Sequence, residues 1–147
     1  MFKSNEIKVY IAAPFFSPVQ AATVLALENL LVRGDGIAYY SPRDEGMLKD
    51  MTETERKERM TYIFERNKEM INWCTHVLAV IDDYDTGTVW EMGYACALGK
   101  KIVTFTDHYY DINVMLNESI VAHCKHIVEI VPSLLGENVT EKGSDVI

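Results

Sequence analysis

The segment DTGTVWEMGYACALGK, residues 85–100, carries residue types that could do chemistry. Its opening Asp-Thr-Gly-Thr reads as a turn into a helix, with Thr86 or Thr88 as the expected cap. Glu91 is then expected in the first helical turn, where the helix dipole and free N–H groups favour an ionised carboxylate. Such a carboxylate at a strand-to-helix junction can attack an electrophilic sugar carbon. The more common role of a glutamate at this position is only to stabilise the helix N-terminus, and local spacing does not decide between the two.

A second candidate segment follows the first predicted strand, where Phe15 and Phe16 lie beside Pro14. Two aromatic side chains at a strand end can sandwich a flat ring such as a nucleobase. They can equally belong to the hydrophobic core. The chain has no GxGxxG after this strand and no GxxxxGK(S/T) motif, so dinucleotide and nucleoside-triphosphate loops are not indicated.

The elements that must position these residues follow from apolar runs and helical periodicity. Strands are predicted at 7–13, 37–40, 76–81 and 101–106, with a fifth strand or edge segment at 126–131. Helices are predicted at 18–33, from just after Asp50 or Thr52 to about Trp73, at 88–98 and at 112–124. Strands that alternate with helices imply a parallel sheet covered on both faces. We expect an α/β fold, a doubly wound flavodoxin-like (Rossmann-like) domain with a five-stranded parallel sheet in the order 2-1-3-4-5.

The predicted topology also says where a ligand would bind. No repeat or linker divides the chain, so residues 1–147 are expected to form one domain. Ligands of such sheets bind beyond the carboxyl ends of strands, where the strand order reverses. Those ends are residues 13–16 after the first strand and 82–91 after the third. The two segments are therefore expected to converge on one site.

Composition excludes several classes of protein. The chain has 147 residues, 48% hydrophobic and 24% charged, which is typical of a folded protein. Its 14 Lys and Arg against 22 Asp and Glu give a net charge of −8, which argues against binding to nucleic acid or to anionic lipid. No apolar run approaches the ~20 residues of a membrane helix, and the N-terminus does not read as a signal peptide. We expect a soluble cytoplasmic protein.

The cysteines and histidines do not indicate a metal site. Cys74, Cys96 and Cys124 are widely spaced in apolar surroundings, so buried thiols are expected. His123 and His126 are three residues apart and could share a helix face, but no third ligand follows. We therefore expect no metal and no cofactor.

Three stretches together resemble the nucleoside 2-deoxyribosyltransferase family. They are VYIAAPFFSP near the N-terminus, DTGTVWEMGYACALGK in the middle and INVM near residue 113. Their order and spacing match from about Val9 to about Ile130, including the YYSPRDEG loop and the IFERN…INWC helix. The resemblance implies a pentosyltransferase of deoxyribonucleoside salvage that exchanges purine or pyrimidine bases on 2′-deoxyribonucleosides. It also implies a homo-oligomer, a hexamer or a dimer-built assembly.

The resemblance assigns roles to individual residues. Glu91 would attack the anomeric carbon and form a covalent deoxyribosyl-glutamate, so that two inversions retain the configuration. Tyr10, in VYIAAPFF, matches the tyrosine that orients this carboxylate. Asp85 matches the acid that hydrogen-bonds the base and passes a proton to its leaving nitrogen. Phe15 and Phe16 match the aromatic walls of the base site.

Other assignments are more peripheral. Asn113 and Met115, in INVM, match residues that a neighbouring subunit contributes to the sugar's 5′-hydroxyl, which implies shared active sites. Asn67 stands where the family often has an aspartate beside the sugar, and an amide hydrogen-bonds but takes no proton. Arg43 is a candidate lid residue over the base, with a solvated loop charge as the alternative. The tail, residues 136–147, is expected to be mobile or to lie at a subunit interface.

Two other functions fit the same fold. A 2′-deoxynucleoside 5′-monophosphate N-glycosidase would resolve the intermediate with water. Its relatives read the phosphate through a first loop that contains Ser and Arg, whereas AAPFFSP has no Arg and favours an uncharged nucleoside. A non-catalytic nucleoside or nucleotide sensor would use the same pocket without turnover.

Overall fold

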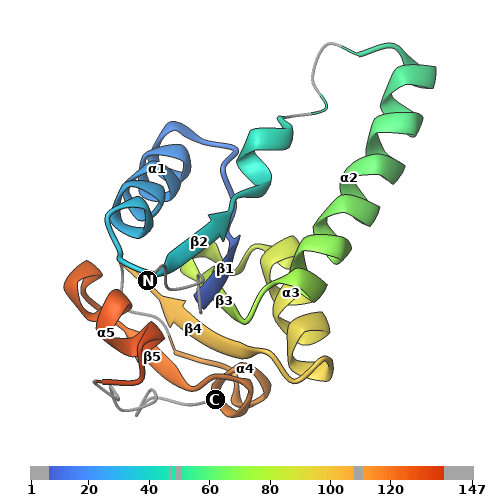
Figure 1. Cartoon of the computed structure of the whole chain (residues 1–147). Helices are drawn as coiled ribbons and strands as arrows, with labels where there is room; N and C mark the ends of the chain where they lie inside the picture. The colour runs from blue at the N-terminus through green and yellow to red at the C-terminus, as the bar shows by residue number, and fades with distance from the viewer. Residues whose placement is uncertain (1–6, 47, 49–50, 108–110, 138–147) are drawn as a thin grey trace.

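Five parallel strands form the centre of the molecule. The computed structural model describes residues 7–46, 48, 51–107 and 111–137, to which all structural statements refer. The strands are β1 (Ile7–Ala12), β2 (Ile37–Tyr40), β3 (His76–Val80), β4 (Lys101–Phe105) and β5 (Ala122–Cys124), in the order β2-β1-β3-β4-β5. The predicted α/β class and strand order are therefore confirmed, and the order reverses between β1 and β3 (Figure 1).

The helices are α1 (Pro18–Val32), α2 (Glu53–Trp73), α3 (Thr86–Ala97), α4 (Val114–Ser119) and α5 (Ile130–Leu134). Short 3₁₀ helices span Pro42–Glu45, Asp82–Tyr84 and Ile127–Glu129. Ser17 with Gln20 begins α1, and Thr52 with Glu55 begins α2, each through a capping box that satisfies free backbone N–H groups. The N-terminal half of α2 projects beyond the sheet (Figure 1).

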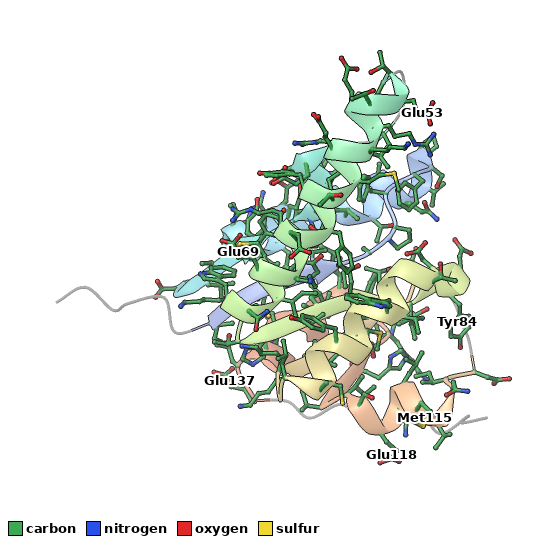
Figure 2. All side chains as sticks on the ribbon, turned by 90° about the vertical axis from the view of Figure 1, so that its right-hand side faces the viewer. Glu53, Glu69, Tyr84, Met115, Glu118 and Glu137 are labelled. Atoms are coloured by element: carbon green, nitrogen blue, oxygen red, sulfur yellow. The ribbon has the colours of Figure 1, made fainter. Side chains whose placement is uncertain are left out.

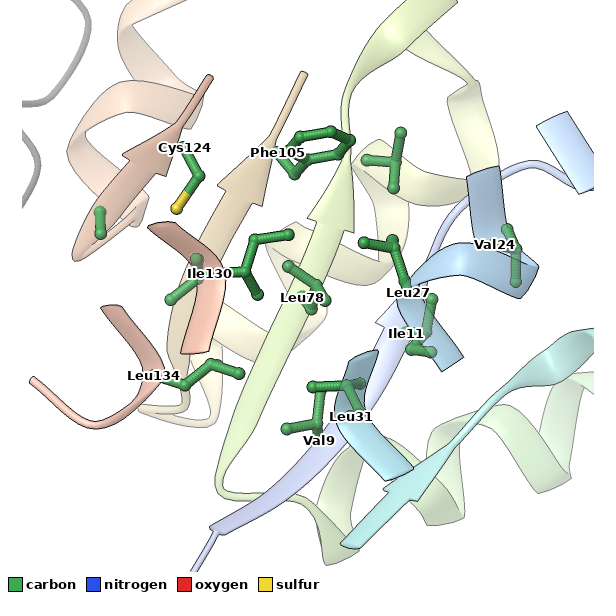
Figure 3. Close-up of a cluster of buried hydrophobic side chains, with 13 residues drawn as sticks. Val9, Ile11, Val24, Leu27, Leu31, Leu78, Phe105, Cys124, Ile130 and Leu134 are labelled. Carbon is green, nitrogen blue, oxygen red and sulfur yellow. The ribbon is translucent and has the colours of Figure 1, made fainter. Parts of the chain in front are cut away.

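The helices cover the two faces of the sheet with separate hydrophobic clusters. Helices α1 and α5 cover one face, where Leu27, Leu31 and Ile130 pack on Val9 and Leu78 (Figure 3). Helices α2, α3 and α4 cover the other face, with their buried contacts made by Ile71, Met92, Ala95 and Leu116. Every residue of β3 is buried, as expected for a central parallel strand.

The parallel register brings two distant segments to the same edge of the sheet. Ala12 of β1 pairs with Ala79 of β3, so both strands end at the same level. The chain leaves β1 through residues 13–17 and leaves β3 through residues 81–85. This is the edge at which the topology predicts a ligand site.

The last part of the fold differs from the prediction. The expected helix over 112–124 is wrong, because α4 ends at Ser119 and the chain then becomes β5. The expected strand over 126–131 is also wrong, since these residues form the last 3₁₀ turn and the start of α5. An edge strand of three residues is too short for an apolar pattern to reveal it.

Two smaller expectations also need correction, and the tail is mostly outside the description. Cys96 is exposed, whereas Cys74 and Cys124 are buried as expected. His123 lies in β5, so it shares no helix face with His126. Of the predicted mobile or interfacial tail, residues 138–147 lie outside the described residues. Among the described helices, none is long and apolar enough to span a bilayer.

Candidate active site

A cavity of about 650 Å³ opens at the carboxyl edge of β1 and β3. Its lining comes from the loops after both strands, from the 3₁₀ turn after β2, from α2 and from α3: Ala13, Phe15, Phe16, Pro42, Gly46, Leu48, Met51, Arg56, Ile63, Asn67, Asp85, Gly87 and Glu91. The segments 13–16 and 82–91 therefore converge, as the strand order predicts. Five of the residues singled out in the sequence line this one cavity.

Glu91 lies at the floor of the cavity on a tyrosine that the sheet holds rigidly. Tyr10 is a fully buried residue of β1, and its hydroxyl donates a short hydrogen bond to Glu91 Oε2. Tyr40, on the neighbouring strand, stacks on the Tyr10 ring with centroids 5.8 Å apart. Burial and the neighbouring Glu91 carboxylate raise the pKa of Tyr10 far above its ordinary value, so this hydroxyl remains a donor.

The environment of Glu91 favours its neutral form. The pKa of Glu91 is raised to about 7, mainly by burial; the Tyr10 hydrogen bond opposes this rise and the nearby Asp85 carboxylate adds to it. The pKa therefore lies near neutrality, where the carboxylate form is available. A reactive carboxylate with this property is typical of catalytic sites.

The start of α3 differs from the prediction in a way that changes the role of the helix dipole. Asp85 is the N-cap, because its Oδ2 accepts from the Thr88 backbone N–H at 2.9 Å and from the Thr88 hydroxyl at 3.1 Å. Neither Thr86 nor Thr88 caps the helix. Since α3 begins at Thr86, Glu91 falls in the second turn rather than the first. The expected dipole stabilisation of its ionised form is therefore wrong, and burial dominates instead.

Asp85 follows a strained turn, Asp82–Tyr84, which positions it at the cavity. Asp83 and Tyr84 have φ values of 64° and 45°, the left-handed region that non-glycine residues rarely adopt. Asp82 anchors this turn, since its Oδ1 accepts from the Thr106 hydroxyl at 2.5 Å and its Oδ2 from the Asp107 backbone N–H at 3.0 Å. The turn is thus tied to the end of β4, which fixes where Asp85 begins α3.

Phe15 and Phe16 form an aromatic wall of the cavity, and the first turn of α1 holds it in position. Phe15 and Phe16 are tilted against each other with centroids 4.8 Å apart, and both line the cavity. Phe15 packs partly on the core, whereas Phe16 is 60% exposed. The Gln20 side chain accepts from the backbone N–H groups of Phe16 and Ser17, so the loop is tied to the first turn of α1.

The opposite wall comes from α2 and the 3₁₀ turn at Pro42–Glu45. Asn67 lines the cavity beside Glu91. The Tyr40 hydroxyl donates to Glu45 Oε1 at 3.2 Å, and Asn67 Oδ1 lies 3.5 Å from the same hydroxyl. Arg59 pairs with the Glu45 carboxylate at 3.1 Å. These contacts, which sequence reasoning missed, hold the 3₁₀ turn against α2.

Besides Tyr10, which lies buried behind Glu91, three predicted site residues do not line this cavity. Arg43 pairs with Glu28 of α1 at 2.5 Å. Burial alone would raise the pKa of Glu28, but its hydrogen bonds to Arg43 and Ser41 hold that pKa below the usual value. Asn113 caps α4 by accepting from the Met115 backbone N–H at 2.8 Å, and Met115 is 73% exposed.

An apolar groove of about 400 Å³ adjoins the cavity between α2 and α3. It adds exposed apolar side chains and shares five residues with the cavity: Leu48, Ile63, Asn67, Gly87 and Glu91. Phe64 and Trp90 are each about half exposed, with ring centroids 5.5 Å apart. Figure 2 shows this side of the molecule, where α2 crosses in front of the sheet beside α3.

The described part of the chain offers no group of three His, Cys, Asp or Glu side chains that could hold a metal ion. The groups gathered at the site are two carboxylates, a buried tyrosine and an aromatic wall. Such a set can stabilise or attack a sugar carbon and exchange a proton with a ring bound beside it.

Comparisons with known proteins identify relatives of this chain. A solved structure of a 2-deoxyribosyltransferase from Bacillus psychrosaccharolyticus is 32% identical, with a TM-score of 0.74 over 84% of this chain and 89% of that chain. A conserved protein from Enterococcus faecalis V583 is 16% identical, with a TM-score of 0.59 over 96% and 90% of the two chains, and shares the fold. No curated protein sequence matches. The family described as nucleoside 2-deoxyribosyltransferase matches residues 9–131. With most of its length matched in sequence and in structure, the chain belongs to the nucleoside 2-deoxyribosyltransferase family.

Proposed function

We propose that this protein exchanges nucleobases on 2′-deoxyribonucleosides through a covalent deoxyribosyl-glutamate. The observation that carries the proposal is the Tyr10–Glu91 hydrogen bond at the floor of a cavity that also holds Asp85. A glutamate with a pKa of about 7 is half ionised near neutral pH. It is therefore available as a nucleophile without a separate base.

The reaction has two displacements at one carbon. The Glu91 carboxylate forms a bond to C1′ of the deoxyribose as the C1′–N bond to the first base breaks. Asp85 gives a proton to the leaving nitrogen, so the base departs neutral. A second base then attacks C1′, Asp85 takes back a proton, and the C1′–O bond to Glu91 breaks. Two inversions leave the configuration retained.

The surrounding residues suit these steps. The Tyr10 hydroxyl fixes one oxygen of Glu91, which leaves the other free to attack. Asp85 uses Oδ2 for its cap, and none of the contacts among described residues occupies Oδ1, which can then face the base. Phe15 and Phe16 offer ring faces for stacking beside the two carboxylates. Asn67 lines the same cavity as Glu91, and its amide would hydrogen-bond the sugar.

We also propose that a second copy of the chain completes the site. Phe64 and Trp90 expose apolar surface directly beside Glu91, and Met115 exposes most of its side chain elsewhere on the molecule. Contact of Asn113 and Met115 from one subunit with the groove of another would cover both surfaces and bring them to the sugar.

Labelling tests the covalent step. Incubation with a deoxynucleoside should add the mass of one deoxyribose to the peptide that contains Glu91. Deoxyinosine with adenine should yield deoxyadenosine, and Glu91→Ala should abolish this exchange. Release of hypoxanthine at the same rate with and without adenine, and no deoxyadenosine, would instead identify a hydrolase. Exchange by Glu91→Ala within a few-fold of wild type would refute the mechanism.

Mixing two inactive variants tests the shared site. Glu91→Ala keeps Met115, and Met115→Arg keeps Glu91, so a mixed assembly contains sites with both native residues. Activity regained on mixing would support sharing between subunits. Its absence in mixtures that gel filtration shows to be assembled would contradict it.

A further inference from the structure

One cation stands apart from the other charged side chains around the cavity. Helix α2 has five basic residues, and four of them pair with carboxylates: Lys57 with Glu53, Arg59 with Glu45, Arg66 with Glu69 and Lys68 with Glu65. The fifth, Arg56, makes no ion pair with any described residue, and it lines the cavity. It is the only cation in that lining as described.

Helix geometry places Arg56 at the far end of the cavity from Glu91. Arg56, Ile63 and Asn67 are spaced by seven and four residues, so they lie along one face of α2. Asn67 is eleven residues after Arg56 in this helix, which separates their Cα atoms by roughly 16 Å. Figure 2 labels Glu53 and Glu69 near the two ends of the same helix. Because Asn67 lies beside Glu91, the guanidinium reaches in from the opposite end.

The rest of the cavity lining is apolar. Besides Arg56, Asn67, Asp85 and Glu91, its larger side chains have no hydrogen-bonding groups, and they are called the apolar section below: Phe15, Phe16, Pro42, Leu48, Met51 and Ile63. A flat aromatic ring can occupy such a section, whereas a hydrated phosphate would lose its water there without a partner. A base bonded to a sugar at Glu91 would therefore cross the apolar section and present its far edge to Arg56.

An arginine selects among bases by what that edge carries. Its fork of N–H donors makes paired hydrogen bonds to the O6 and N7 acceptors of a 6-oxopurine. An amino group at the same position, as in adenine, is itself a donor and leaves the guanidinium facing another donor. A mismatch of this kind rejects the wrong base as well as favouring the right one.

On the proposed function, which this inference deepens, we infer that Arg56 is a specificity-determining residue that recognises the carbonyl oxygen on the far edge of the base. The class favoured is the oxo bases, hypoxanthine and guanine among purines, over bases with an amino group at that position. Phe15 and Phe16 supply stacking for every base, since each has a π face, so discrimination depends on the guanidinium.

Equilibrium binding of the two free bases tests this without turnover. Hypoxanthine and adenine differ at the edge in question, and their dissociation constants would be measured by calorimetry on the wild-type protein and on Arg56→Ala, Arg56→Lys and Lys57→Ala. Arg56 is exposed within α2, and alanine is the best helix former, so the fold is expected to persist. Lys57→Ala removes a neighbouring charge that is paired with Glu53, and serves as the control.

The wild type should bind hypoxanthine more tightly, and Arg56→Ala should lose about tenfold in hypoxanthine affinity with little change for adenine. Arg56→Lys should fall between, because an ammonium lacks the planar fork. The inference is overturned if Arg56→Ala weakens both bases equally or neither, or if the wild type binds neither. It is likewise overturned if the variant weakens only a deoxynucleoside 5′-phosphate. If the labelling experiment fails while the binding ratio shifts as expected, the proposed chemistry is wrong and the recognition stands.

Discussion

Replacing Tyr10 with Phe removes one oxygen from a buried site and should change the pH at which Glu91 becomes a nucleophile. The hydroxyl donates to the Glu91 carboxylate, and this bond is the contact that lowers the Glu91 pKa against burial and Asp85. A hydrogen bond to a charged group contributes about 1.5–3 kcal/mol, and one pKa unit corresponds to about 1.4 kcal/mol. Loss of the bond should therefore raise the pKa of Glu91 from about 7 by about 1–2 units.

The assay is the dependence of kcat/KM for base exchange on pH. On the proposed mechanism activity requires the ionised carboxylate, so it should rise with pH through the Glu91 pKa, and this rise should move to higher pH in Tyr10→Phe. At about pH 6 the variant should lose on the order of 10- to 50-fold more activity than it loses at about pH 9, where both proteins are mostly ionised. Any loss of orientation would add a factor that is the same at all pH values.

Tyr40→Phe is the matched control. It makes the same change on the adjacent strand, where the hydroxyl donates to Glu45 rather than to Glu91. Its kcat/KM should rise over the same pH range as that of the wild type. If Tyr10→Phe lost the same factor of kcat/KM at every pH, the electrostatic role of the hydrogen bond would be refuted. If its activity instead rose at a lower pH than that of the wild type, the hydrogen bond would raise the Glu91 pKa rather than lower it.

Four further outcomes are expected. The pKa of Glu91 is about 7 in the folded protein and near 4.5 in the unfolded chain, so ionisation of this side chain destabilises the fold at high pH. Glu91→Gln should therefore be more stable than wild type by at most about 3 kcal/mol at pH 8. Thermal unfolding should show that this difference in stability disappears towards pH 4.5. Asp85→Asn should keep the α3 cap, hence stability, while kcat falls about 10²- to 10⁴-fold; Asp85→Ala should additionally cost about 1 kcal/mol in urea unfolding. Leu27→Ala, at a fully buried position, should cost about 2–5 kcal/mol by the same measurement. Asp83→Ala should be less stable in urea unfolding than Asp83→Gly by about 1 kcal/mol, because both variants lack the carboxylate but only glycine adopts a φ of 64° without strain; equal stability of the two variants would contradict this reading of the turn.

The fold was predictable where buried apolar runs are long enough to see. Residues 77–81 form a continuous apolar stretch after a helix, and the strand that contains them, His76–Val80, is fully buried at the centre of the sheet. Gly99 lies at the end of α3, where a positive φ suits it. The edge strand Ala122–Cys124 is different, since its three residues carry no period, and the neighbouring apolar residues 127–131 suggest a strand more strongly. Residues 122–124 become the strand because they pair with β4 in the folded protein.

The site was predictable in part, for a related reason. Glu91 and Asp85 stand out locally, and parallel strand order is enough to bring them to Phe15 and Phe16. Tyr10 reads as an ordinary core residue within an apolar strand, and only the family resemblance pointed to it. Arg56 was missed because α2 is charged around much of its circumference. Which of its charges meets the cavity depends on the angle at which α2 leaves the sheet, and no local pattern encodes that angle.

Helix α2 has one end in the core and the other in solvent, and this gives the two walls of the cavity different local stabilities. Ile71, near its C-terminal end, is its only buried residue, while the first turns rest on the Thr52 capping box and surface ion pairs. Backbone amides of those first turns should exchange with deuterium through local opening, long before amides of β1 and β3, which require global unfolding. Fraying of α2 therefore opens the cavity from the Arg56 side without disturbing Tyr10 or Glu91. On the proposed function, a nucleoside could then enter and leave the cavity at a cost well below the unfolding free energy of the protein, with Glu91 held in place throughout.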